Sequence, residues 1–84
     1  MENIKNETEF YQWLGSQFRT LRDKAGLTQK DIAVKAGIAQ TDLSRFERMG
    51  TKLSAYRIAL LFSILGLDFT QFVAESEKKT HSHA

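Results

Sequence analysis

The 84-residue chain contains neither cysteine nor proline, and it holds five glycines. Without cysteine it can form no disulfide bond, thiolate metal site or cysteine nucleophile. No apolar stretch approaches the roughly 18 uncharged residues of a membrane span, and the polar, acidic start MENIKNETE does not resemble a signal peptide. We therefore expect one small domain that acts in the cytoplasm and has no membrane partner.

The composition supports a packed interior. Hydrophobic residues make up 42% of the chain, and its aromatic residues are six Phe, two Tyr and one Trp. This fraction is too high for an intrinsically disordered chain. A domain of this size buries only about 60–65% of the surface of its unfolded chain, so we expect a second subunit to extend the core.

Apolar residues recur at helical spacing, and no convincing strand pattern is present. The sequence therefore predicts an all-α fold of five helices. They are expected at residues 7–24, from Gln29, from about Gln40, after Ser54 and at residues 68–75. The domain is expected at residues 10–74, between a polar N-terminal arm (1–9) and a polar, disordered tail (75–84).

Two of these helices are short and are joined by a glycine-containing turn. Thr28 offers a hydroxyl N-cap to the first of them, and Asp31 follows three residues later, which is a capping-box arrangement. Small Ala33 lies where the helices would cross, and Gly37 lies at the turn, where a positive φ is often needed. This pattern is typical of the helix-turn-helix, whose second helix enters the major groove of DNA.

Basic residues are concentrated in the middle of the chain. Residues 19–57 carry a net charge of +5, whereas residues 1–18 carry −2 and residues 58–84 carry −1. A segment of this kind can face a polyanion such as nucleic acid. An ordinary solvated helical surface has the same composition, so charge alone leaves both interpretations open.

The sequence over about residues 13–72 resembles the Cro/C1 family of DNA-binding domains, also called lambda repressor-like or XRE. The matching residues are spread over the whole predicted domain: Leu14-Gly15, Leu21-Arg22, Gly26-Leu27-Thr28-Gln29, Ile32-Ala33, Ala36-Gly37-Ile38, Leu43-Ser44, Phe46-Glu47, Ser54 and Leu65-Gly66-Leu67. Matches so distributed are far more specific than one short motif. The resemblance implies a transcriptional regulator that binds double-stranded DNA sequence-specifically, with repression as the expected effect.

The resemblance also implies roles for individual residues. Those at the start and outer face of the recognition helix are expected to read bases: Gln40, Thr41, Ser44 and Arg45. Gln can bind adenine through paired hydrogen bonds, and Arg can bind O6 and N7 of guanine. The residues expected to contact DNA phosphates are Gln29, at the start of the preceding helix, and the basic residues that flank the reading face, Lys30, Arg48 and Lys52.

Arg22 and Glu47 match residues that pair with each other in the family. An arginine in such a protein also suggests a phosphate contact, but the structural ion pair is the preferred interpretation. If the pair is partly buried, removal of either partner costs about 3–5 kcal/mol, because the other charge is left without a partner.

The chain departs from the family pattern around the recognition helix. Ala39 has no side-chain acceptor to cap this helix. Asp42, in its first turn, either compensates through the helix dipole or accepts a hydrogen bond from a cytosine amino group. Met49 stands where the family has glycine, with Gly50 one residue later, and Leu53 replaces a common proline. These changes affect the loop between the third and fourth predicted helices, which carries Lys52.

Apolar residues near the end of the chain have little core left to cover them. Because self-association in the family usually runs through the region after the fourth helix, the expected dimer interface comprises Leu67, Phe69, Phe72 and Val73. A two-fold homodimer presents its recognition helices about 34 Å apart, one turn of DNA, so a palindromic operator is expected.

An enzyme is not expected. His81 and His83 lie in the predicted tail, away from any acid or nucleophile on a rigid element, and no phosphate-binding glycine loop is present. We expect no cofactor and no metal, since a His-Ser-His tail is a short, flexible site that binds metal weakly at best.

A protein-interaction role is the alternative function. Gly37-Ile38-Ala39-Gln40 followed by Ser44-Arg45-Phe46-Glu47 is similar to antitoxins of the HipB type. The resemblance to that group implies a toxin protein as partner, together with repression of the operon that encodes both proteins. A stable complex with the product of a neighbouring gene would distinguish this role from that of a free-standing regulator.

Overall fold

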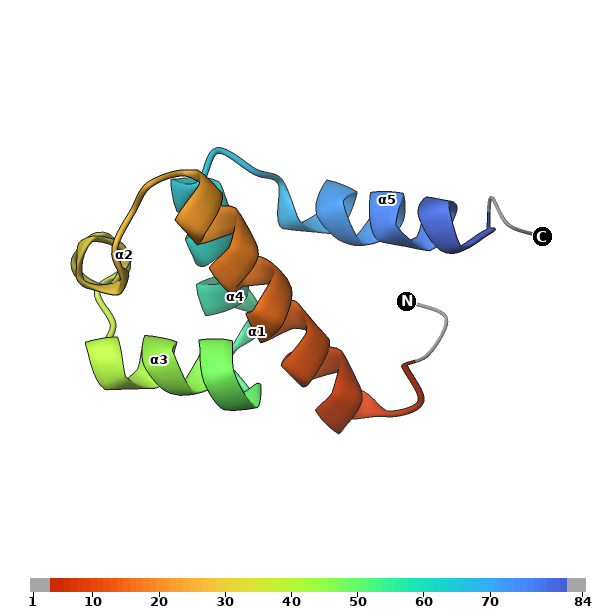
Figure 1. The fold of residues 1–84 in the computed structure, drawn as a ribbon, viewed down its shortest axis with the longest axis horizontal. Coiled ribbons are helices and arrows are strands. Elements are labelled where there is room, and N and C mark those ends of the chain that lie inside the picture. Colours follow the sequence, from red (N-terminus) through yellow and green to blue (C-terminus); the bar gives the residue numbers. More distant parts are fainter. Residues whose placement is uncertain (1–3, 82–84) are drawn as a thin grey trace.

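The computed structural model describes residues 4–81, with side chains described for residues 4–77. Its helices are α1 (Glu7–Lys24), α2 (Gln29–Ala36), α3 (Gln40–Met49), α4 (Ala55–Ile64) and α5 (Phe69–His81). Figure 1 shows α1 running diagonally across the molecule, with α2 and α3 to one side, α4 behind it and α5 along the upper edge. No strand is present among residues 4–81, and the predicted all-α fold of five helices is confirmed.

The helices begin where their capping residues predict. Thr28 Oγ1 accepts a hydrogen bond from the N–H of Asp31, and Oδ2 of Asp31 accepts one from the N–H of Thr28, which completes the capping box of α2. Ser54 caps α4 by accepting from the N–H of Arg57. Ala39 makes no side-chain capping bond at the start of α3, as its methyl side chain predicts.

Two glycines allow α1 and α3 to pack closely. A Cβ on Gly15 would overlap with the backbone carbonyl oxygen of Phe46, so α1 can cross α3 at this distance only without a side chain there. Gly50 has a φ of +70°, and a Cβ on it would lie 2.5 Å from the Cα of Gln12. The glycine that follows Met49 therefore both ends α3 and allows it to rest on α1.

Buried apolar side chains from α1 to α4 and the α3–α4 loop form the core: Leu14, Phe18, Ile32, Ala33, Leu43, Phe46, Leu53, Ile58, Leu61 and Phe62. The ring centroid of Phe18 lies 6.2 Å from that of Phe46 and 5.5 Å from that of Phe62. Leu53, which stands where the family often has proline, belongs to this core. The core thereby fixes α2 and α3 on α1 and α4.

α5 packs on the core through aromatic side chains. The ring centroids of Phe69 and Phe72 lie 5.2 and 5.0 Å from that of Phe62. Phe72 also stacks on Trp13 at 5.7 Å, which joins α5 to α1. The first half of α5 is therefore held to the domain by ring contacts on two sides.

α5 is longer than predicted. The sequence pattern ended this helix at residue 75, whereas it continues to His81. Residues 75–80 are rich in Glu and Lys, which favour helices, and include neither Gly nor Pro. Residues 75–81 are therefore helical, which corrects the expectation of disorder there; residues 82–84 of the predicted tail lie outside the described residues.

Among residues 4–81, no single helix is both long and apolar enough to cross a membrane. Ala55–Ile64 and Phe69–Glu77 meet the length and composition criteria only when taken together, and the chain bends by 92° between them.

Candidate nucleic-acid interface

α2 and α3 form a helix-turn-helix. In the turn between them, residues 37–39, Gly37 takes the left-handed conformation with a φ of +68°. The N–H of Ile38 donates to the carbonyl oxygen of Ala33 over 3.1 Å and so ties the turn to α2. Figure 1 shows α2 end-on and α3 from the side, so the two helices cross rather than run parallel. Ala33 is buried, and its small side chain permits this close crossing.

α3 has one buried side and one exposed side. The buried side consists of two apolar residues and one carboxylate: Leu43, Phe46 and Glu47. Three of the residues predicted to read bases, Gln40, Thr41 and Arg45, are exposed. Thr41 and Arg45 are four positions apart and therefore lie on the same face of the helix. Exposed Arg48 continues this face toward the C-terminal end of α3.

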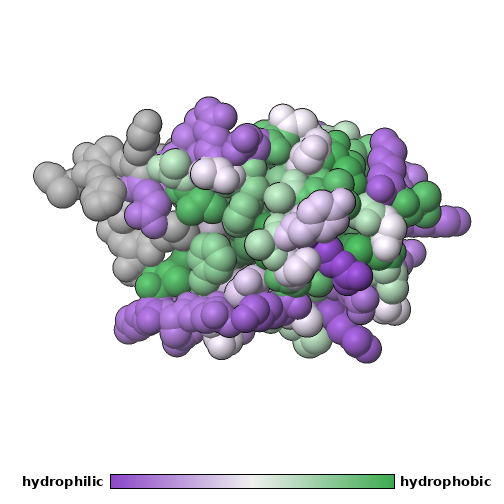
Figure 2. Space-filling view, turned by 180° about the vertical axis from the view of Figure 1, so that it is seen from behind, coloured by the Kyte–Doolittle hydropathy of each residue, from purple (hydrophilic) through white to green (hydrophobic). Residues whose placement is uncertain are grey.

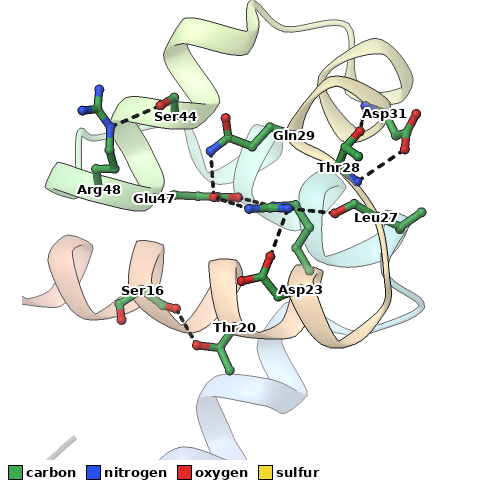
Figure 3. A network of polar contacts seen from close by, with 11 residues as sticks. Ser16, Thr20, Asp23, Leu27, Thr28, Gln29, Asp31, Ser44, Glu47 and Arg48 are labelled. Carbon is green, nitrogen blue, oxygen red and sulfur yellow. Dashed lines mark hydrogen bonds and ion pairs between the residues drawn. The ribbon is translucent and has the colours of Figure 1, made fainter.

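Ser44, the fourth predicted base reader, is half-buried. Its Oγ accepts a hydrogen bond from Nε of Arg48 over 3.2 Å (Figure 3). The terminal nitrogens of Arg48 point away from the helix in this view. In the structure Ser44 thus contacts Arg48, a predicted phosphate contact, while its own O–H group remains able to donate a hydrogen bond.

A buried ion pair joins α1 to α3 behind this face. Arg22 donates from Nε to Oε2 of Glu47 over 2.7 Å and from Nη2 to Oε1 over 2.9 Å, which is the two-pronged geometry of strong arginine–carboxylate pairs. The side chains of Arg22 and Glu47 are 9% and 0% exposed. The structure thus holds the ion pair that the family resemblance implied.

The remaining contacts of Arg22 also lie within the protein. Its Nη1 donates to the carbonyl oxygen of Leu27 over 2.7 Å and lies 3.3 Å from Oδ1 of Asp23. The hydrogen bonds to Glu47 raise the pKa of Arg22 above its ordinary value, so the guanidinium stays charged. Arg22 is therefore engaged with the interior of the domain.

Gln29, the first residue of α2, belongs to the same network. Its Nε2 donates to Oε1 of Glu47 over 3.0 Å (Figure 3). Sequence reasoning missed this contact, because the two residues lie 18 positions apart on different helices and no local spacing indicates it. Lys30, the next predicted phosphate contact, is exposed beside Gln29.

Lys52, the last predicted phosphate contact, lies in the α3–α4 loop. Its Nζ is 3.1 Å from Oε1 of Glu7 on α1, and both side chains are about two-thirds exposed, at 66% and 68%. The hydrogen bond with Glu7 and the charge of its carboxylate raise the pKa of Lys52. Solvent screens an exposed ion pair of this kind and it adds little stability, so Lys52 can exchange Glu7 for another anion.

The predicted dimer residues lie on α5 and in the loop that precedes it. Leu67, Phe69, Phe72 and Val73 are all half-buried. Phe69 and Val73 also line an apolar groove of about 460 Å³ between α1, α4 and α5, together with Phe10 and Ile58. Figure 2 shows apolar side chains gathered across the middle of the face on which α4 lies, with polar side chains above and below.

The described residues include no group of three or more His, Cys, Asp or Glu side chains placed to hold a metal ion. The side chain of His81 and the whole of His83 lie outside what the structure describes.

A helix-turn-helix whose second helix exposes polar and basic side chains is the architecture of a DNA-binding protein. The helix-turn-helix domain family matches residues 13–71, which include both helices of the motif and all the buried apolar residues of the core. The chain therefore belongs to the helix-turn-helix domain family of DNA-binding proteins. No curated protein matches the chain.

Proposed function

We propose that the protein is a transcriptional regulator of the Cro/C1 type that binds a palindromic operator as a homodimer. The observation that carries this proposal is the two-sided character of α3. One side of α3 is buried in the core, and the opposite side exposes Gln40, Thr41 and Arg45 to solvent. The major groove of DNA is about 12 Å wide and admits one α-helix in this orientation.

The exposed residues divide into two groups by their chemistry. We assign base contacts to Gln40, Thr41, Ser44 and Arg45, because amide and guanidinium groups form paired hydrogen bonds with base edges and hydroxyl groups form single ones. We assign phosphate contacts to Lys30 and to Arg48, which Ser44 contacts. Lys52 joins this second group when DNA displaces Glu7, and Gln29 does so from the start of α2.

We assign the dimer contact to the apolar groove and the adjoining part of α5. Phe69 and Phe72 already contact Phe62 of the same chain, so a second copy would extend an existing aromatic cluster. Val73 and Phe10 line the groove and would be covered by that copy. A two-fold dimer of this kind would bind a palindromic operator and repress transcription from it. It would do so in the cytoplasm of a prokaryotic cell.

Selection of duplex DNA from a random pool by the purified protein, near physiological salt, tests this function. We expect enrichment of a palindrome whose half-sites are about one helical turn apart. Binding that depends on salt but enriches no sequence would contradict the proposal, since it would leave only phosphate contacts.

The apolar groove also favours a second candidate, an antitoxin of the HipB type. The groove lies between α1, α4 and α5, so a protein bound there would leave α3 available to DNA. In that case the groove would hold a toxin rather than a second copy. Co-expression with the products of adjacent genes, followed by purification of the complex, distinguishes the two. A stable partner supports the antitoxin, and a homodimer without a partner supports the free-standing regulator.

A further inference from the structure

The buried ion pair and the DNA-facing surface are connected through one side chain. Oε1 of Glu47 accepts two hydrogen bonds, one from Nη2 of Arg22 over 2.9 Å and one from Nε2 of Gln29 over 3.0 Å. Arg22 and Glu47 belong to the interior, whereas Gln29 is half-buried at the first position of α2. Figure 3 shows Gln29 between α2 and the part of α3 that carries Ser44 and Arg48.

The chemistry of this contact determines which end of the Gln29 amide faces the protein. A carboxylate paired with arginine has only acceptor oxygens, so the NH₂ group of Gln29, not its carbonyl, must lie against Glu47. One N–H of Nε2 is used in this bond. The second N–H of the same nitrogen remains to donate to an acceptor at the surface, and a DNA phosphate is such an acceptor.

The position of Glu47 is itself tightly fixed. Its side chain is 0% exposed, and Arg22 binds both of its oxygens. A glutamine held in this way is ordered before DNA arrives, so less conformational entropy is lost on binding than for a free side chain. The charge of Arg22 also offsets the negative charge of Glu47, which would otherwise repel a phosphate near Gln29.

We propose that Glu47 is a positioning residue for DNA binding: held by Arg22, it fixes the amide nitrogen of Gln29 so that its second N–H donates to one phosphate of the operator. The inference rests on the proposed function, because it requires a bound DNA duplex. It gives the buried pair a role in affinity that is separate from its contribution to stability.

Neutral methylphosphonates, placed one at a time in the enriched duplex, test the proposal. The dissociation constant is measured by fluorescence anisotropy for each duplex with wild-type protein and with Gln29→Ala. At one phosphate per half-site, the methylphosphonate should weaken wild-type binding about three- to tenfold more than it weakens binding of Gln29→Ala. This ratio is the coupling between Gln29 and that phosphate, and general destabilisation does not change it.

The double variant Arg22→Met/Glu47→Leu then removes the pair without leaving a charge unpartnered. At the same phosphate, the methylphosphonate should weaken binding of this double variant by about as little as it weakens binding of Gln29→Ala. Glu47→Asp keeps the charge beside Arg22 but shortens the side chain, so it should weaken the coupling as well. This variant replaces the double variant in the test if the double variant does not fold. Leu61→Met, a volume-conserving core change outside both the network and the groove, is the matched control and should keep the full coupling.

The possible failures are distinct. If the pair variants keep the wild-type coupling, Glu47 has only a structural role and the proposal is wrong. If Gln29→Ala shows no coupling to any phosphate while wild-type protein binds its palindrome, the inference fails and the proposed function stands. If selection enriches no duplex at all, both fail together.

Discussion

Loss of one partner from the Arg22–Glu47 pair is expected to remove much of the stability of the domain. Both side chains are almost fully buried, so Arg22→Ala leaves a carboxylate, and Glu47→Ala a guanidinium, without its counter-charge in the interior. Such a change costs about 3–5 kcal/mol. A domain of this size has a free energy of unfolding of about 5–10 kcal/mol, so each variant should lose a third or more of it.

Urea unfolding followed by circular dichroism measures this loss. With an m-value of about 1–1.5 kcal/mol/M, the midpoint should fall by about 2–5 M for either single variant. Arg22→Met/Glu47→Leu should lie within about 1 kcal/mol of wild type or above it, because no charge is left unpartnered. Lys24→Ala, an exposed residue at the end of α1, is the control and should change stability by less than about 0.5 kcal/mol.

The reasoning is refuted if both single variants match the surface control, or if the double variant loses as much as the two single variants added together.

Three other changes have expected outcomes. Gly15→Ala should destabilise the domain by about 1–3 kcal/mol, because the new methyl group overlaps with the carbonyl oxygen of Phe46. Thermal unfolding measures this loss, and an unchanged stability would mean that α1 can move away from α3. Glu7→Gln frees Lys52 and should tighten DNA binding about two- to fivefold in anisotropy titrations with little change in stability, whereas weaker binding would show that the pair itself aids recognition. Hydrogen bonds from the N-cap threonine lower the pKa of Asp31 below its ordinary 3.8. This carboxylate thus stabilises α2 above about pH 4 and loses that effect as the pH falls through its lowered pKa in the folded protein. Asp31→Asn should therefore flatten the acid limb of a profile of stability against pH, and an unchanged acid limb would contradict this.

Local signals predicted the fold well where each element carries its own start and stop. The N-cap at Thr28, the cap at Ser54 and the glycine after Met49 define helix ends without reference to the rest of the chain, and the structure places the ends there. The end of α5 was predicted too early because the pattern followed apolar residues only. Helix propensity extends α5 beyond the last apolar contact, to His81.

The candidate site was less accessible to sequence reasoning, because its details depend on long side chains from different helices. The family resemblance implied the pair of Arg22 with Glu47, but nothing local indicates that Gln29 donates to the same carboxylate. The contact between Glu7 and Lys52 likewise joins residues far apart in the sequence. In these cases the backbone was predictable, whereas the partner of each flexible side chain was set by tertiary packing.

The most direct test of the account is base discrimination by Arg45 on the exposed face of α3. Dissociation constants of wild type and Arg45→Ala are compared on the enriched duplex and on each of its single-base variants, with Arg19→Ala, an exposed arginine on α1, as the matched control. We predict that Arg45→Ala loses about 1–3 kcal/mol of binding free energy, concentrated at one base pair, and that Arg19→Ala keeps the wild-type base preferences. Equal weakening by Arg45→Ala on every duplex would contradict the claim that this face of α3 reads the bases.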